Sequence, residues 1–311
     1  MKILFAPMEG IAHHLYRSAQ AAVFENADEY FIPFISPRNS SFSHRERSDV
    51  LPENNAGMHA VPQLLSNDSQ SFLWAAGELE KLGYAEVNLN LGCPSATVVR
   101  KGKGAGMLAY PEKLDRFLAQ IFQRCPLQIS IKTRLGMRAP EEFPPLLEIF
   151  NRYPVKRLIV HPRLGTDGYR GTVRLESFRW AMENSRAPLC YNGDLFTPQN
   201  LKDFQQQFPS VESVMCARGF LYHPGLAGLF RGTGDEAPQR LEKFHRMLYE
   251  GDRQEIGTEA FVLCKMKEVW AALGQGQELS PKAMKRLRKA EAYGAYETAV
   301  EAAFAELKER L

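Results

Sequence analysis

Residues 85–94 of the chain read AEVNLNLGCP, and residues 156–163 read KRLIVHPR. Each stretch contains a short run rich in apolar and β-branched residues, followed by polar residues, glycine or proline. Such runs are typical of parallel strands that are buried on both faces. Similar runs recur along the first three quarters of the chain, and the sequence predicts eight strands, at residues 2–8, 29–35, 60–65, 85–91, 127–133, 156–161, 187–192 and 212–217.

Segments with helical periodicity separate most of the predicted strands. Residues 70–82 place four apolar side chains on one stripe, and residues 111–122 begin with a proline, which is favoured at the first position of a helix. Eight strands that alternate with helices over about 230 residues predict an α/β fold, the (β/α)8 TIM barrel. A doubly wound parallel sheet is the alternative, but it favours a glycine-rich turn after its first strand, where this chain has Pro7-Met8-Glu9-Gly10.

The last quarter of the chain has a different pattern. It contains no convincing strand, and residues 259–273 and 293–311 have the periodicity of helices. The sequence therefore predicts two domains, a barrel at residues 1–234 and a small all-helical domain at residues 235–311. Five cations occur in the second domain without an acidic residue between them, which indicates either a solvated helix face or a phosphate-binding surface: Lys282, Lys285, Arg286, Arg288 and Lys289.

Composition excludes several classes of protein. With 44% hydrophobic and 24% charged residues, the 311-residue chain is neither largely disordered nor of low complexity. No window approaches the roughly 18 consecutive apolar residues of a membrane helix, and Pro7 interrupts any signal-peptide core. The five cysteines are scattered without a CxxC pair, which argues against a disulfide framework and a zinc site. These features predict a soluble cytoplasmic protein without a metal.

The predicted strands end in residues that are costly to bury without a partner. Asn90, Lys132, His161, Asn192 and Arg218 stand at or near the ends of five strands. One such residue is most often structural, but their repetition at the carboxyl ends, where TIM barrels carry their active sites, predicts a site. The glycine-containing ends of strands seven and eight suit a phosphate group, and Lys132 suits the electron-rich edge of a flavin, so the set favours flavin mononucleotide (FMN).

In order along the chain, these residues and their neighbours resemble the bacterial tRNA-dihydrouridine synthases. One matching segment is Asn88-Leu89-Asn90-Leu91-Gly92-Cys93-Pro94-Ser95, whose LNxGCP pattern is the most specific part of the resemblance. Residues 264–267 with Trp270 are similar to the family's C-terminal RNA-binding domain. The other matching segments are Ala6-Pro7-Met8-Glu9-Gly10, Val61-Pro62-Gln63-Leu64, Gly104-Ala105-Gly106-Met107-Leu108, Lys132-Thr133-Arg134, His161-Pro162-Arg163, Asp167-Gly168-Tyr169, Asn192-Gly193-Asp194 and Arg218-Gly219.

The resemblance implies an FMN enzyme, driven by NADPH, that reduces the C5–C6 double bond of specific uridines in tRNA to 5,6-dihydrouridine. It implies a hydride transfer from N5 of FMN to C6 of uracil and a proton transfer from Cys93 to C5. The FMN contacts that it implies are Ala6, Pro7, Met8, Gln63, Lys132, His161, Asn192, Gly193, Asp194, Ala217 and Arg218. The uracil and RNA contacts that it implies are Asn90, Arg134, Tyr169, Arg100, Lys101, Lys103, Lys265 and Lys267.

Three positions depart from the family pattern. Leu164 stands where the family often has threonine, Ala217 where it usually has glycine, and Ile32-Pro33 where its second strand commonly ends Thr-Glu. The methyl group of Ala217 bears on FMN affinity, and Pro33 bears on the uridine specificity. Two other functions stay open, an FMN barrel oxidoreductase that acts on a small molecule and a non-catalytic RNA-binding protein. A ribosomal RNA substrate, and NADH in place of NADPH, also stay open.

Overall fold

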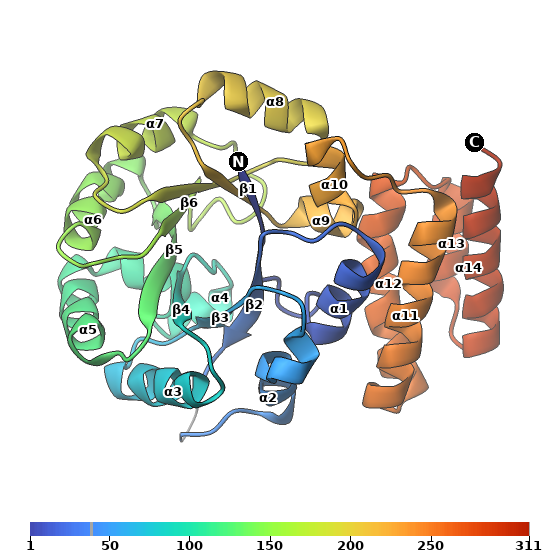
Figure 1. Cartoon of the computed structure of the whole chain (residues 1–311), viewed down its shortest axis with the longest axis horizontal. Coiled ribbons are helices and arrows are strands. Elements are labelled where there is room, and N and C mark those ends of the chain that lie inside the picture. Colours follow the sequence, from blue (N-terminus) through green and yellow to red (C-terminus); the bar gives the residue numbers. More distant parts are fainter. Residues whose placement is uncertain (38–39, 311) are drawn as a thin grey trace. The chain divides into compact units, whose positions relative to one another are not determined.

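The structure, a computed structural model, describes residues 1–37 and 40–310. Its eight strands form a closed barrel in which consecutive strands pair in parallel (Figure 1). This confirms the predicted TIM barrel, and each predicted strand overlaps an observed one. The strands are β1 (Lys2–Phe5), β2 (Glu29–Ile35), β3 (Ala60–Leu64), β4 (Glu86–Leu91), β5 (Gln128–Gly136), β6 (Leu158–Leu164), β7 (Leu189–Asn192) and β8 (Ser213–Cys216).

Two strands run further than the sequence predicts. β5 reaches Gly136 and β6 reaches Leu164, so Arg134 lies within a strand rather than after one. Arg134 and His161 are register partners, and an irregularity after Arg134 lets Gly136 pair with Leu164. The strands continue because this pairing satisfies backbone N–H and C=O groups beyond the apolar runs that the sequence displays.

The chain folds as two compact units. The first holds Met1–Pro7, Asp28–Gly193 and Phe208–Met215, and the second holds Met8–Ala27, Asp194–Gln207 and the described residues from Cys216 onward. The predicted domain boundary at residues 234 and 235 stays a prediction.

Helices of the first unit surround its strands, with α3, α5, α6 and α7 on the outside of the barrel (Figure 1). α3 begins where the Asp68 carboxylate accepts a hydrogen bond from the Ser71 N–H at 2.8 Å, and α5 begins at Pro111 as predicted. The helices are α2 (His44–Val50), α3 (Ser69–Lys81), α4 (Ala96–Arg100), α5 (Pro111–Arg124), α6 (Phe143–Phe150) and α7 (Leu175–Asn184), with 3₁₀ turns η1 (Pro52–Asn55), η2 (Gly104–Ala109) and η3 (Pro140–Glu142).

The second unit is helical and has an aromatic core. Trp270 Nε1 donates to the Tyr296 hydroxyl at 2.9 Å, and this hydroxyl lies 2.7 Å from His245 Nε2. Burial lowers the pKa of His245 to about 3, so the neutral ring accepts the hydroxyl proton. The helices are α1 (His14–Val23), α8 (Pro198–Gln207), α9 (Arg218–Tyr222), α10 (Leu226–Arg231), α11 (Pro238–Ile256), α12 (Glu259–Gly276), α13 (Pro281–Lys289) and α14 (Tyr293–Lys308). Residue 311, the last of the predicted helix at 293–311, lies outside the described residues.

An ion pair crosses the inside of the barrel at its amino-terminal end. Both Nη atoms of Arg157, just before β6, donate to the Glu29 carboxylate of β2, at 2.5 and 2.7 Å. Because β2 and β6 are not neighbours in the sheet, this contact spans the barrel. Burial by itself would raise the pKa of Glu29, but the hydrogen bond and charge of Arg157 outweigh it and lower the pKa.

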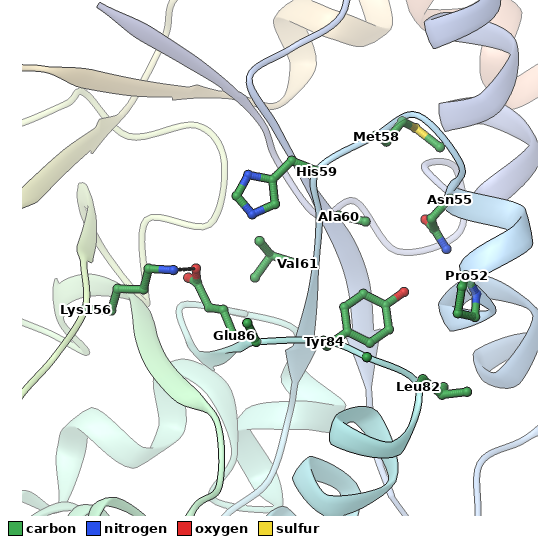
Figure 2. A pocket seen from close by; sticks show the side chains of 12 residues that line it. Pro52, Asn55, Met58, His59, Ala60, Val61, Leu82, Tyr84, Glu86 and Lys156 are labelled. Carbon is green, nitrogen blue, oxygen red and sulfur yellow. Dashed lines mark ion pairs between the residues drawn. The ribbon is translucent and has the colours of Figure 1, made fainter.

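A pocket of about 320 Å³ opens at the same end of the strands (Figure 2). Its lining includes Ala60, the first residue of β3, and Glu86, the first residue of β4, whose carboxylate lies 2.6 Å from Lys156 Nζ. Because TIM barrels carry their chemistry at the carboxyl ends of the strands, this pocket is separate from the predicted site.

The Glu29–Arg157 pair makes a prediction about stability. Glu29→Gln leaves the Arg157 charge without its counter-ion, so we expect the free energy of unfolding at pH 7 to fall by about 3 kcal/mol. A carboxylate with a lowered pKa loses its contribution as the pH falls through that pKa, so the difference between the two proteins should shrink below about pH 4. Urea denaturation at three pH values measures both effects.

The matched control is Glu78→Gln, which removes the exposed partner of Lys81 one turn away on α3, at 2.6 Å. This change should alter the free energy of unfolding by less than about 0.5 kcal/mol. Equal losses in the two variants would contradict the special role of the pair inside the barrel.

Candidate active site

Polar side chains of three neighbouring strands stand in register. Gln63 of β3 pairs with Asn88 of β4, which pairs with Ser130 of β5, and Asn90 pairs with Lys132 one step further along. Side chains two residues apart on a strand share a face, so these five form one polar stripe. Gln63, Asn88 and Ser130 are completely buried, and Asn90 is 6% exposed. The stripe ends beside the segment that carries Cys93.

Asn90 holds the backbone at Cys93. Its Oδ1 accepts the N–H groups of Gly92 at 3.0 Å and Cys93 at 2.9 Å, and its Nδ2 donates to Gln63 Oε1 at 2.7 Å. One N–H of the Asn90 amide remains beyond these three hydrogen bonds. The predicted contact between Asn90 and uracil would use that group.

The loop after Cys93 folds back onto it. The Ala105 N–H donates to the Cys93 carbonyl at 3.0 Å. Gly104 has a φ of 55°, and a Cβ atom there would lie 2.8 Å from the Cys93 carbonyl oxygen and 3.1 Å from Cys93 Cβ. Only glycine permits this approach without a shift of the backbone. The sequence offered a signal for it, since glycine stands at two of the three positions 104–106.

Arg134 braces the same segment from its other side. Its guanidinium is 1% exposed and donates through Nε to the Gly92 carbonyl at 2.8 Å and through Nη1 to the Leu164 carbonyl at 2.7 Å. Burial lowers its pKa. The centre of the Tyr169 ring lies 5.7 Å from the guanidinium carbon, and Tyr169 is 62% exposed. An exposed ring in this position offers a stacking surface for a base.

Lys132 has a different environment. Its ammonium group has no hydrogen bond or ion pair with any residue that the structure describes, and its side chain is partly exposed. Burial, followed by the charge of Arg134, lowers its pKa to about 7. An unpaired ammonium group among buried amides has the chemistry to meet the acceptor-rich edge of a ring.

Other predicted FMN contacts of the first unit have partners within the protein. Arg163 Nη1 lies 2.9 Å from His161 Nε2, and because a guanidinium only donates, this ring nitrogen accepts and Nδ1 carries the proton. Asn192 Nδ2 donates to the Met215 carbonyl of β8 at 2.7 Å. A Cβ atom on Gly193 would lie 2.1 Å from the Tyr191 hydroxyl oxygen, which explains the glycine.

The loop cations predicted to touch RNA differ in exposure. Arg100 and Lys101 are exposed at the end of α4. Lys103 is partly buried, and its Nζ donates to Ser36 Oγ at 3.2 Å. Arg100 and Lys101 are therefore the two that face solvent.

Predicted site residues also occur in the second unit. Arg218 Nη2 donates to Asp194 Oδ1 at 2.7 Å, and the Arg218 guanidinium lies 5.2 Å from the centre of the Phe196 ring. Asp194 therefore orients Arg218. The FMN contacts predicted for both residues stay predictions, as do those of Ala6, Pro7, Met8 and Ala217.

Lys265, predicted to touch RNA, lies beside a buried carboxylate. Its Nζ is 3.6 Å from Asp252 Oδ1, which also lies 2.9 Å from His13 Nε2. Part of the Lys265 charge is thus neutralised within the second unit. Lys267 is partly exposed, and its predicted RNA contact stays a prediction, as does that of Lys265.

Two further properties bear on the class of protein. Among the helices described, none is long and apolar enough to cross a membrane. Within the described ranges, no three His, Cys, Asp or Glu side chains are grouped so that they could hold a metal ion.

Solved structures with similar folds contain TIM barrels. Morphinone reductase superposes with a TM-score of 0.54 and 12% sequence identity over 78% of this chain and 88% of that chain. The old yellow enzyme from Trypanosoma cruzi superposes with a TM-score of 0.54 and 11% identity over 78% of this chain and 91% of that chain. At these identities the likeness concerns the fold alone.

Sequence comparisons are more specific. The tRNA-dihydrouridine(16) synthase of Neisseria meningitidis is 28% identical over 86% of this chain and 84% of its own length. The enzyme of the same name from Escherichia coli strain K12 is 27% identical over 81% of this chain and 84% of its own length. The family model for dihydrouridine synthase (Dus) matches residues 4–307, nearly the whole chain. This chain therefore belongs to the dihydrouridine synthase family.

Proposed function

We propose that this protein is a tRNA-dihydrouridine synthase that binds FMN and reduces a uridine of tRNA with electrons from NADPH. The observation that carries the proposal is the position of Cys93. Its backbone is held by hydrogen bonds from both sides, at the end of the polar stripe that holds the unpaired ammonium group of Lys132.

The side chains of the first unit fit a flavin ring by their chemistry. Lys132 presents an unpaired cation, and the amide of Gln63 keeps one N–H beyond the bond that it donates to Asn88. We propose that these two groups, with His161, Asn192 and Gly193, hold FMN. We retain as predicted contacts Ala6, Pro7, Met8, Asp194, Ala217 and Arg218. When bound, FMN supplies the hydride. The protein binds the reactants, orients them and supplies the proton.

We assign that proton to the Cys93 thiol. Uracil accepts a hydride poorly unless an acid quenches the charge that develops at C5, and a positioned general acid contributes roughly 10²–10⁴-fold to such a step. The Cys93 peptide is fixed by Asn90, Arg134 and Ala105, so the backbone that carries the thiol is held in place. Tyr169 would stack on a uracil that has left the RNA stack.

The substrate assignment draws on the relatives. Their names specify uridine 16 of tRNA, so this is the position to test first. A groove of about 610 Å³ between α13 and α14 supports an RNA partner. Four exposed cations of α13 line it at helical spacing, so they share one stripe: Lys282, Lys285, Arg286 and Lys289. The rest of the lining is Ala290 with Ala295, Thr298, Ala299 and Ala302 of α14.

The direct test is an anaerobic visible spectrum of the purified protein. We expect NADPH to bleach the flavin absorbance and unmodified tRNA to restore it. Bleaching without recovery on tRNA would contradict the tRNA substrate, and addition of ribosomal RNA or a small enone would then identify the alternative. A protein that binds RNA but no flavin would be a non-catalytic RNA-binding protein.

Cys93→Ala tests the proton donor. We expect the variant to bind FMN and to accept electrons from NADPH at unchanged rates, because these steps do not use the thiol. Reoxidation of the reduced flavin by tRNA should slow by roughly 10²–10⁴-fold. Stopped-flow spectroscopy measures both half-reactions. Cys125→Ala, at a cysteine between α5 and β5, is the control, and unchanged reoxidation in Cys93→Ala would refute the assignment.

Lys132 predicts a pH dependence. With its pKa lowered to about 7, Lys132 is charged below this pH and neutral above it in the free protein. FMN affinity should therefore weaken as the pH rises through about 7, and in Lys132→Met this component should vanish. Quenching of flavin fluorescence, compared between the two proteins at each pH, removes the contribution of the FMN phosphate itself. Parallel pH profiles would show that Lys132 does not face the ring.

The groove predicts a salt effect. Each phosphate contact contributes about 0.7–0.9 to the slope of log K against log salt. Lys285→Gln with Arg286→Gln should therefore reduce this slope for tRNA binding by about 1.5 while kcat at saturating tRNA stays unchanged. The matched control is Lys113→Gln with Arg116→Gln, two exposed cations one turn apart on α5. Equal slopes in all three proteins would place the RNA elsewhere.

A further inference from the structure

Beyond Asn90, the polar stripe continues as a chain of hydrogen bonds between side chains. Gln63 Nε2 donates to Asn88 Oδ1 at 2.7 Å, and Asn88 Nδ2 donates to Ser130 Oγ at 2.9 Å. Neither Asn88 nor Ser130 is among the residues predicted to contact FMN or uracil. Both are completely buried, so their polar atoms have no bulk water to replace a lost partner.

The donor and the acceptor of each of these hydrogen bonds follow from the contact of Asn90 with the backbone at Cys93. The N–H groups of Gly92 and Cys93 can only donate, so the Asn90 amide must present its oxygen to them. Its NH₂ group must then face an acceptor, which is Gln63 Oε1. By the same reasoning the Gln63 NH₂ group faces Asn88 Oδ1, the Asn88 NH₂ group faces Ser130, and the Ser130 oxygen accepts.

A substitution at Ser130 therefore alters the hydrogen bonds that hold the Cys93 backbone. Loss of the hydroxyl leaves the Asn88 NH₂ group buried without an acceptor, which is costly. Reversal of the Asn88 amide would relieve this, but it would turn NH₂ groups of Asn88 and Gln63 toward each other. If all three amides reversed, the mismatch would arrive at Asn90, whose NH₂ group would then face the N–H groups of Gly92 and Cys93.

We propose that Asn88 and Ser130 are positioning residues for Cys93, which act through Gln63 by fixing the orientation of the Asn90 amide. The proposal rests on the proposed function, since the position of Cys93 matters for turnover only if its thiol is the proton donor. The Ser130 hydroxyl accepts its hydrogen bond from Asn88, so its influence on Cys93 passes through the three amides.

Two variants interrupt the hydrogen bonds between Asn90 and Ser130, and two others serve for comparison. Ser130→Ala removes the terminal acceptor, and Asn88→Leu removes the central amide with little change of volume. Ser130→Thr keeps the hydroxyl and should restore the behaviour. Ser213→Ala is the matched control, since Ser213 is a buried strand serine, 5% exposed, whose hydroxyl donates to the Leu189 carbonyl and also contacts the Cys190 thiol, on the other side of the barrel sheet from Asn88 in strand order.

Backbone hydrogen exchange, followed by NMR on the FMN-loaded protein without RNA, measures how well the N–H groups of Gly92 and Cys93 are protected. We expect exchange of the Gly92 and Cys93 N–H groups to accelerate by about tenfold or more in Ser130→Ala and Asn88→Leu, since a protecting hydrogen bond is lost. Exchange in α5 should stay unchanged, and so should the two N–H groups in Ser130→Thr and Ser213→Ala. Unchanged exchange at Gly92 and Cys93 in both disruptive variants would overturn the proposal.

Turnover with tRNA gives the second measurement. We expect kcat to fall by about tenfold in Ser130→Ala, with the KM for tRNA unchanged and with recovery in Ser130→Thr, because the change displaces a reacting group rather than a binding surface. Faster exchange with an unchanged kcat would overturn the positioning role. An unsubstituted protein that reduces no tRNA would instead refute the proposed function, while the exchange data would still decide whether the chain holds Cys93.

Discussion

The register between β3, β4 and β5 is the constraint on which the candidate active site depends. It places Gln63, Asn88 and Ser130 side by side and sets Asn90 beside Lys132. A slip of one residue would turn these side chains to the opposite face, where apolar residues such as Leu89 and Leu91 now lie. The barrel has no free edge at which such a slip could be absorbed, because its strands close on themselves.

The hydrogen bonds described around Cys93 hold its backbone and that of Gly92. Asn90 accepts its N–H, Ala105 donates to its carbonyl, and Arg134 donates to the preceding carbonyl of Gly92. These contacts hold the backbone that carries the thiol, so they fix where the side chain begins. The same logic explains Gly104, whose missing side chain makes room for the cysteine.

Much of this arrangement could be predicted from the sequence, because strands buried on both faces and polar residues at their ends leave visible patterns. The barrel, its eight strands and the helices at 70–82 and 111–122 were all predictable in this way. Asn88 was not singled out, because it lies within the strand and its role depends on partners 25 and 42 residues away. Arg134 was predicted as a base contact, and the sequence held no signal that its guanidinium also binds two carbonyl groups. Cross-strand partners and hydrogen-bond direction arise only when register is known.

The contact between Glu29 and Arg157 bears on the route by which ligands reach the site. The interior of a TIM barrel is a packed core rather than a pore, and this ion pair is part of the packing at the amino-terminal end. A molecule that reaches Lys132 must enter and leave by the carboxyl-terminal mouth. Two molecules that are too large to occupy that mouth together must bind one after the other. The first must therefore be released before the second can bind.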